Sequence, residues 1–135
     1  MGYKIDEIEG IGPAYREKLS GAGIATTDDL LTHCASAKGR KAMTEQTGVS
    51  EKHLLNWTNM ADLMRVSGIG RQYAELLEAS GVDTIKELRT RNADNLAAKM
   101  LEVNTDKKLA KATPTTSMIQ DWIDQAKTTD PKITH

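Results

Sequence analysis

The chain has 135 residues, a formal net charge of −1 and 27% charged residues, with one cysteine and no phenylalanine. This length fits one domain, or two small halves that share a core, and it suffices for folding without disulfides or metal. A single cysteine excludes an intrachain disulfide, and no apolar run approaches the roughly 18 residues of a membrane-spanning helix. The near-neutral charge provides no general positive field for nucleic acids. The first residues lack the pattern of a secretory signal, so we expect a cytoplasmic protein.

Helix signals begin near the N-terminus. Pro13 follows Gly12 and suits the first turn of a helix, because the missing proline N–H would be unpaired there anyway. The glycines of residues 21–23 predict the end of this helix. Thr26 and Asp29 have capping-box spacing, which predicts that the next helix starts there.

Two later helices also have clear starts. Ser50 predicts the N-cap of a longer helix over residues 50–64. Thr116 or Ser117 predicts the N-cap of a last helix that runs to about residue 127. Scarce aromatics and few valines disfavour strands, so we expect an all-α protein.

The chain contains an internal repeat. Residues 8–30 read IEGIGPAYREKLSGAGIATTDDL and residues 66–88 read VSGIGRQYAELLEASGVDTIKEL, with nine of 23 positions identical. Trp57 and Trp122 form a later pair at a larger offset, so the second copy has seven extra residues, which we place near residues 112–116. The duplication predicts two pseudo-symmetric units of short helices packed into one compact body.

The repeat also sets the boundaries that we expect. The first unit covers residues 1–64, the second covers residues 65–127, and each has about five short helices. Residues 128–135 are polar and predict a flexible tail. In the second unit, Thr84 and Glu87 repeat the capping-box spacing.

Each copy has the sequence Gly-Ile-Gly immediately before a predicted helix. Two glycines two residues apart permit a tight turn, and the isoleucine between them can anchor the turn in the core. Such a turn points backbone N–H groups outward at the start of the next helix, where the helix dipole favours one phosphate. A purely structural turn has the same pattern, so both interpretations stay open at this stage.

The two turns, with Tyr15 and Leu19 in one copy and Tyr73 and Leu77 in the other, resemble the helix-hairpin-helix motif. In proteins with that motif, the turn amides hold a DNA phosphate without reading bases. Nearly the whole chain is also similar to a bacterial family of tandem hairpin proteins known as a domain of unknown function. The resemblance therefore implies a tandem helix-hairpin-helix fold and assigns no activity.

Charge near the turns differs between the copies. Hairpins that bind DNA strongly usually have Lys or Arg two residues after the second glycine, where this chain has Ala14 and Gln72. Glu9 precedes the first turn, whereas Arg65 and Arg71 flank the second. We therefore expect the second turn to lead any contact with DNA.

The leading hypothesis is a non-enzymatic, sequence-independent module that binds double-stranded DNA weakly, with no cofactor and no metal. A pseudo-twofold pair of turns suits a duplex, because each turn can contact one strand. The expected phosphate-binding residues are Gly10, Ile11, Gly12, Arg65, Gly68, Ile69, Gly70 and Arg71. The alternative is a protein–protein adaptor on the same scaffold that binds no nucleic acid. Buried turn isoleucines with a large apolar patch elsewhere would favour the adaptor.

Catalytic residues are not expected. Cys34 stands beside His33, but adjacent helical residues point about 100° apart and do not face one reacting atom. These residues and His53 also lack the spacing of metal ligands. Trp57 and Trp122 recur at matched helical positions, so we expect them in the two cores rather than on a base-stacking surface.

Two short basic clusters lie outside the turns. Residues 38–41 read KGRK, and Lys107, Lys108 and Lys111 lie close to Asp106 in the sequence. Such clusters are usually solvated surface, and this is the interpretation that we adopt for both. The first cluster could instead extend a track of phosphate contacts.

Overall fold

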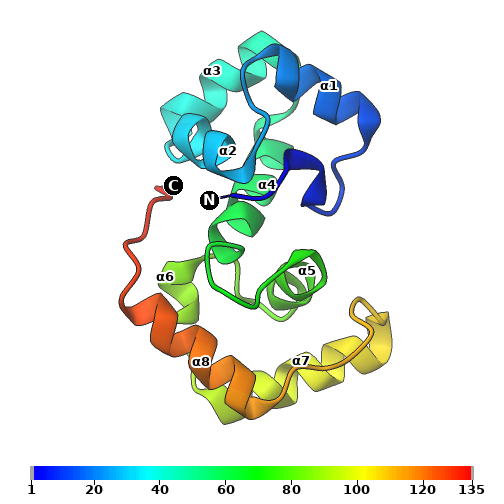
Figure 1. The fold of residues 1–135 in the computed structure, drawn as a ribbon, viewed down its shortest axis with the longest axis vertical. Helices are drawn as coiled ribbons and strands as arrows, with labels where there is room; N and C mark the ends of the chain where they lie inside the picture. The colour runs from blue at the N-terminus through cyan, green and yellow to red at the C-terminus, as the bar shows by residue number, and fades with distance from the viewer. Residues whose placement is uncertain (1, 135) are drawn as a thin grey trace. The chain divides into compact units, whose positions relative to one another are not determined.

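The structure is a computed structural model that describes residues 2–134. Over this range the chain forms eight α-helices, one short 3-10 helix and no strand, which confirms the all-α prediction. Lys4 and Thr26 form an isolated antiparallel bridge. None of the helices in the described range is long and apolar enough to cross a bilayer. The chain divides into two compact units, residues 2–62 with 132–134, and Leu63–Pro131 (Figure 1).

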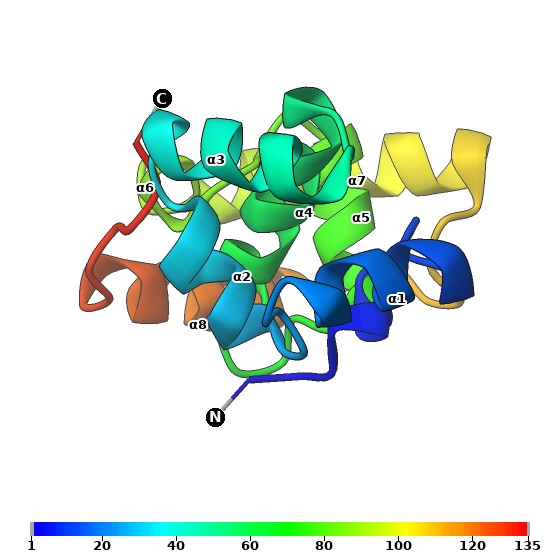
Figure 2. The same cartoon turned by 90° about the horizontal axis from the view of Figure 1, so that it is seen from above.

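The first unit is built around a small aliphatic core. Its elements are η1 (Ile5–Glu7), α1 (Pro13–Gly21), α2 (Thr27–Cys34), α3 (Ala37–Thr47) and most of α4 (Glu51–Leu63). Helix α1 packs on η1 and α3, and α2 packs on α3 (Figures 1 and 2). Ile8, Leu19 and Leu30 are fully buried in this unit. Their burial supplies the main stabilising term, because removal of apolar surface from water drives packing.

The second unit contains four helices. They are α5 (Arg71–Ala79), α6 (Ile85–Leu88), α7 (Ala93–Lys107) and α8 (Thr116–Lys127). Helices α7 and α8 pack together, while α5 packs on α7 and α6 packs on α8 (Figure 1). The expectation of about five helices in each unit is therefore one too high here. Residues 63–65, which are equivalent to η1, complete α4 and the turn after it instead.

Most of the helices begin with a side-chain cap. The capping residues are Thr26, Ser36, Ser50, Thr84, Asn92 and Thr115. Thr26 and Asp29 form the predicted reciprocal capping box. The predicted N-cap of the last helix, Thr116 or Ser117, is one or two residues late, because the hydroxyl of Thr115 accepts from the Met118 N–H at 3.1 Å.

A buried arginine holds the last described residues in the first unit. Arg40 is 5% exposed and donates to the carbonyl oxygens of Cys34 at 2.9 Å and Thr134 at 2.8 Å. The Thr134 N–H also donates to the Ala35 carbonyl at 2.8 Å. The prediction of a solvated cluster at residues 38–41 is therefore wrong for Arg40, because its guanidinium satisfies carbonyls at the α2–α3 junction.

Candidate functional site

The two Gly-Ile-Gly turns have the same backbone geometry. Gly10 and Gly68 have φ values of +98° and +96°, a region that favours glycine. In each turn the isoleucine N–H donates to the carbonyl three residues earlier at 3.1 Å. Ile11 is 3% exposed and Ile69 is 0% exposed, so both fill the core beneath their turns as predicted. The repeat in the sequence is therefore a repeat in local structure.

A tryptophan supports each turn from the inside. A Cβ atom on the first glycine would lie 3.3 Å from Nε1 of Trp57 in the first unit and 3.0 Å from Nε1 of Trp122 in the second. Tyr15 lies against Trp57 with ring centroids 4.9 Å apart, and Tyr73 lies against Trp122 at 5.3 Å. Both tryptophans are buried, as the sequence predicted. Each tryptophan ring therefore packs closely against the first glycine of its turn.

The second glycine of each turn lies under open space. Gly12 and Gly70 have φ values of −92° and −100°, which any residue adopts. A Cβ atom on either glycine would have no other atom within 4 Å. Neither backbone conformation nor packing within the chain therefore requires glycine at these two positions.

The helices that follow these glycines begin without side-chain caps. No side chain caps α1 or α5, in contrast to the other six α-helices of the described chain. Within residues 2–134, no acceptor is bonded to the backbone N–H of Gly12 or Gly70. The first N–H groups of a helix have no partner inside the helix, and they carry the positive end of its dipole. Each turn thus presents free donors and partial positive charge.

The charge around the first turn is partly neutralised. Arg16 pairs with Asp6 at 3.2 Å, and both side chains are partly exposed. This pair borders a surface cavity of about 640 Å³ between η1 and α1, to which Lys4 and Ser20 also contribute. The guanidinium nearest in sequence to the first turn is therefore already opposite a carboxylate.

The two arginines predicted beside the second turn lie in different environments. Arg65 is half-buried, and its Nη1 donates to the Asp130 carbonyl at 3.0 Å, so it holds the segment after α8. Arg71 is exposed as the first residue of α5. Of the two, Arg71 is therefore the more accessible to a ligand.

A contact that sequence reasoning missed joins α5 to the loop after α7. The Gln72 side-chain oxygen accepts from the backbone N–H of Lys111 at 3.2 Å. Gln72 lies two residues after Gly70, so this loop reaches the first turn of α5. The extra residues of the second copy give the signal that a longer loop exists, but not where it packs.

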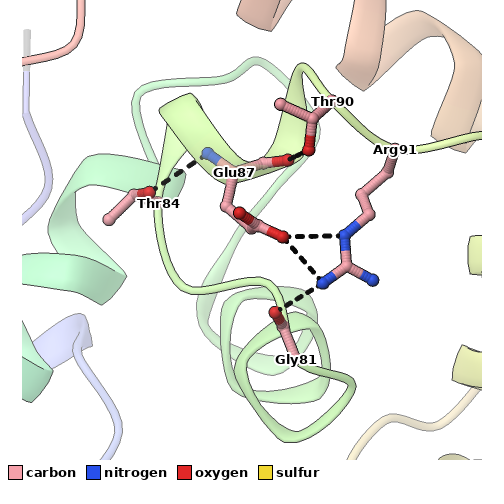
Figure 3. Close-up of polar contacts among 5 residues, drawn as sticks. All are labelled: Gly81, Thr84, Glu87, Thr90 and Arg91. Carbon is pink, nitrogen blue, oxygen red and sulfur yellow. Dashed lines mark hydrogen bonds and ion pairs between the residues drawn. The ribbon is translucent and has the colours of Figure 1, made fainter.

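Figure 3 shows how the bend after α5 is held. Arg91 donates to the Gly81 carbonyl at 2.9 Å and pairs with the Glu87 carboxylate at 2.8 Å. Thr84 accepts from the Glu87 N–H at 3.2 Å. The second predicted capping box is therefore only half formed, because the Glu87 carboxylate turns to the guanidinium. Arg91 thus has a structural role in this bend.

The described residues contain no cluster of side chains suited to a metal ion. Burial raises the pKa of the Cys34 thiol to about 11, although Thr58 and Arg40 oppose the shift. A protonated thiol is a poor nucleophile and a poor ligand. His33, next to it in sequence, is exposed.

The family described as "Domain of unknown function (DUF4332)" matches residues 9–129. The chain belongs to the DUF4332 family. The match includes both Gly-Ile-Gly turns and α1 to α8. Comparisons with curated proteins and with solved structures give no match. The DUF4332 description names no activity, so the function has to be argued from the two turns themselves.

Proposed function

We propose that this DUF4332 protein is a non-enzymatic, sequence-independent module that binds double-stranded DNA through its phosphates. The two Gly-Ile-Gly turns would act as helix-hairpin-helix elements. One observation carries the proposal: in both units, an uncapped helix start lies behind a glycine that nothing inside the chain requires.

A glycine without an internal role is explained by the approach of an external group. A phosphate oxygen that bonds to a turn amide lies close to the backbone, where a side chain would be in the way. A helix N-terminus carries about half a positive charge and stabilises an exposed anion by about 0.3–1 kcal/mol. Backbone amides make no contact with base edges, so this mode of binding is independent of sequence.

The binding is expected to be weak. The net charge of −1 and the Arg16–Asp6 pair leave few cations for phosphates. With about two to four phosphates neutralised, the dissociation constant should be micromolar or higher at physiological salt. The logarithm of affinity should fall by about 0.9 per phosphate for each tenfold rise in salt.

The adaptor hypothesis requires an exposed apolar surface to which a protein partner can bind. Ile11 and Ile69 are buried, which is one of the two features expected of an adaptor; the other is a large exposed apolar patch elsewhere. The large apolar side chains exposed in the described part of the chain are Tyr3, Leu101 and Met118, on the N-terminal segment, α7 and α8. We therefore treat a protein partner as the alternative outcome of the test.

The test is fluorescence anisotropy of a labelled duplex of about 20 base pairs, titrated with protein at several salt concentrations. The wild type should bind saturably and more weakly as salt rises. A Gly12→Val/Gly70→Val variant should bind at least about 10-fold more weakly, because its side chains fill the space over the amides. Gly21→Val is the matched control, since Gly21 is also open and exposed but lies at the far end of α1.

Each variant is first checked for helical content by circular dichroism. Failure of the folded wild type to bind at low salt overturns the proposal and directs attention to protein partners. Equal binding by the double variant and the control overturns the role of the turns. A loss confined to the double variant supports the proposal.

A further inference from the structure

The loop after α7 distinguishes the second unit from the first. In the first unit, Gly48 ends α3 in the left-handed conformation and the next cap, Ser50, follows two residues later. In the second unit, Lys108 ends α7 in the same conformation, with φ of 53°, and the next cap, Thr115, follows seven residues later. We call residues 107–111 the lysine loop, since three of its five residues are lysines.

The lysine loop is held on two sides. The Asn104 side chain accepts from the Ala110 N–H at 2.9 Å and donates to the Ala110 carbonyl at 3.1 Å. The Gln72 side chain accepts from the Lys111 N–H at 3.2 Å. Ala110 is 8% exposed, so the loop also has an apolar anchor. The backbone of Lys111 is therefore fixed beside the first turn of α5.

The charges of the lysine loop face solvent. Lys107, Lys108 and Lys111 are exposed, and none of them forms an ion pair with another described residue. Lys107 and Lys108 lie at the C-terminal end of α7, where cations are favoured by the helix dipole. Lys111 lies beyond that end, so the dipole of α7 does not stabilise its positive charge. Their exposure agrees with the sequence-based interpretation of all three as solvated surface, whereas the link of the Lys111 backbone to α5 was not predicted.

We propose that the lysine loop supplies to the second turn the positive charge that Gln72 lacks, so that an anionic polymer is bound through two neighbouring phosphates. One phosphate would lie on the amides at Gly70, and the next would lie on the ammonium groups of Lys108 and Lys111. This inference rests on the proposed function. It predicts that the second unit binds a polyanion more tightly than one isolated phosphate.

The experiment compares two double variants with the same change in net charge. Lys108→Gln/Lys111→Gln removes cations of the lysine loop, and Lys86→Gln/Lys127→Gln removes exposed cations of α6 and α8. In both views α6 and the lysine loop lie at opposite ends of the second unit (Figures 1 and 2). All four side chains are exposed, so both variants should keep the helical content and melting temperature of the wild type.

Duplex binding is measured by anisotropy over a salt series. The loop variant should bind about 10-fold more weakly near 0.1 M salt, and its salt slope should be shallower by about 0.9, because one phosphate contact is lost. The control variant should change affinity by less than about threefold and keep the slope of the wild type. Gln72→Ala keeps the charge but releases the loop from α5, so it should also weaken binding several-fold.

The outcomes separate the two proposals. If the wild type binds but the loop and control variants behave alike, the inference is overturned while the proposed function stands. Unchanged affinity in Gln72→Ala likewise refutes the requirement that the lysine loop be held on α5. If the wild type does not bind, the proposed function fails and this inference fails with it.

Discussion

The two glycines of the second turn should differ in their response to the same substitution. Gly68 has φ of +96°, and a Cβ atom there would lie 3.0 Å from Nε1 of the buried Trp122. Gly70 has φ of −100° and open space around the added carbon. We therefore expect Gly68→Ala to destabilise the fold and Gly70→Ala to leave its stability almost unchanged.

The magnitude follows from three terms at Gly68. A left-handed backbone costs an alanine about 1–2 kcal/mol. Displacement of the Trp122 ring, which already contacts Tyr73, adds about 1–3 kcal/mol of overpacking. The lower conformational entropy of the unfolded alanine variant offsets about 0.4–1 kcal/mol of this loss. Together these terms give a loss of about 1–5 kcal/mol, a large share of the roughly 5–15 kcal/mol typical of a domain.

At Gly70 the same entropy gain opposes the weaker helix-capping tendency of alanine, so the net change should be below about 0.5 kcal/mol. The assay is urea unfolding followed by circular dichroism, with tryptophan fluorescence as a second probe. A Gly68→Ala variant within about 0.5 kcal/mol of the wild type would refute the assignment of strain to that glycine. A Gly70→Ala variant that loses more than about 1 kcal/mol would refute the claim that its glycine has no internal role.

The half-buried Glu78 and the buried Cys34 give further predictions. Burial, helped by Asp83 and Glu75, raises the pKa of Glu78 in the folded state, so this group favours folding at low pH and loses that contribution as pH rises through its folded pKa. Glu78→Gln should therefore raise the free energy of unfolding by about 0.5–1 kcal/mol at neutral pH, after allowance for partial exposure, and should change it little near pH 3. Urea unfolding at both pH values checks this prediction. No gain in stability at neutral pH would contradict it. Because burial raises the pKa of Cys34 to about 11, a thiol reagent should modify the native protein slowly at neutral pH and the urea-unfolded protein rapidly. Fast modification of the native protein would show that the thiol is accessible.

Features set by neighbours within a few residues could be predicted from the sequence. The capping box of Thr26 with Asp29, the helix start after Ser50 and the tight Gly-Ile-Gly turns all belong to this class. The second capping box was predicted in the same way and formed only halfway. The Glu87 carboxylate pairs with the Arg91 guanidinium instead of the backbone N–H, and the sequence does not show which of the two partners is preferred.

Contacts between distant residues could not be predicted. The Gln72–Lys111 hydrogen bond spans 39 positions, and its formation depends on the path of a loop with no regular periodicity. Arg40 stands in a basic tetrapeptide that is typical of solvated surface, yet it is buried against carbonyl oxygens. The error at Arg40 came from a charge interpreted by its sequence neighbours, whereas its partners in the fold are the carbonyl oxygens of Cys34, Ala35 and Thr134.

The duplication separates what the fold requires from what it does not. Both copies retain a first glycine with positive φ over a tryptophan, as the turn demands, and both also retain a second glycine that the turn does not demand. The copies differ at the two residues that follow, where Pro13 and Ala14 correspond to Arg71 and Gln72. The second copy thus has a cation, Arg71, and a side chain that holds the lysine loop, Gln72, next to its turn amides. The first copy has neither at the equivalent positions. If the proposed function holds, the second unit should therefore provide most of the affinity for DNA, and the first unit should add no more than one helix N-terminus, about 0.3–1 kcal/mol.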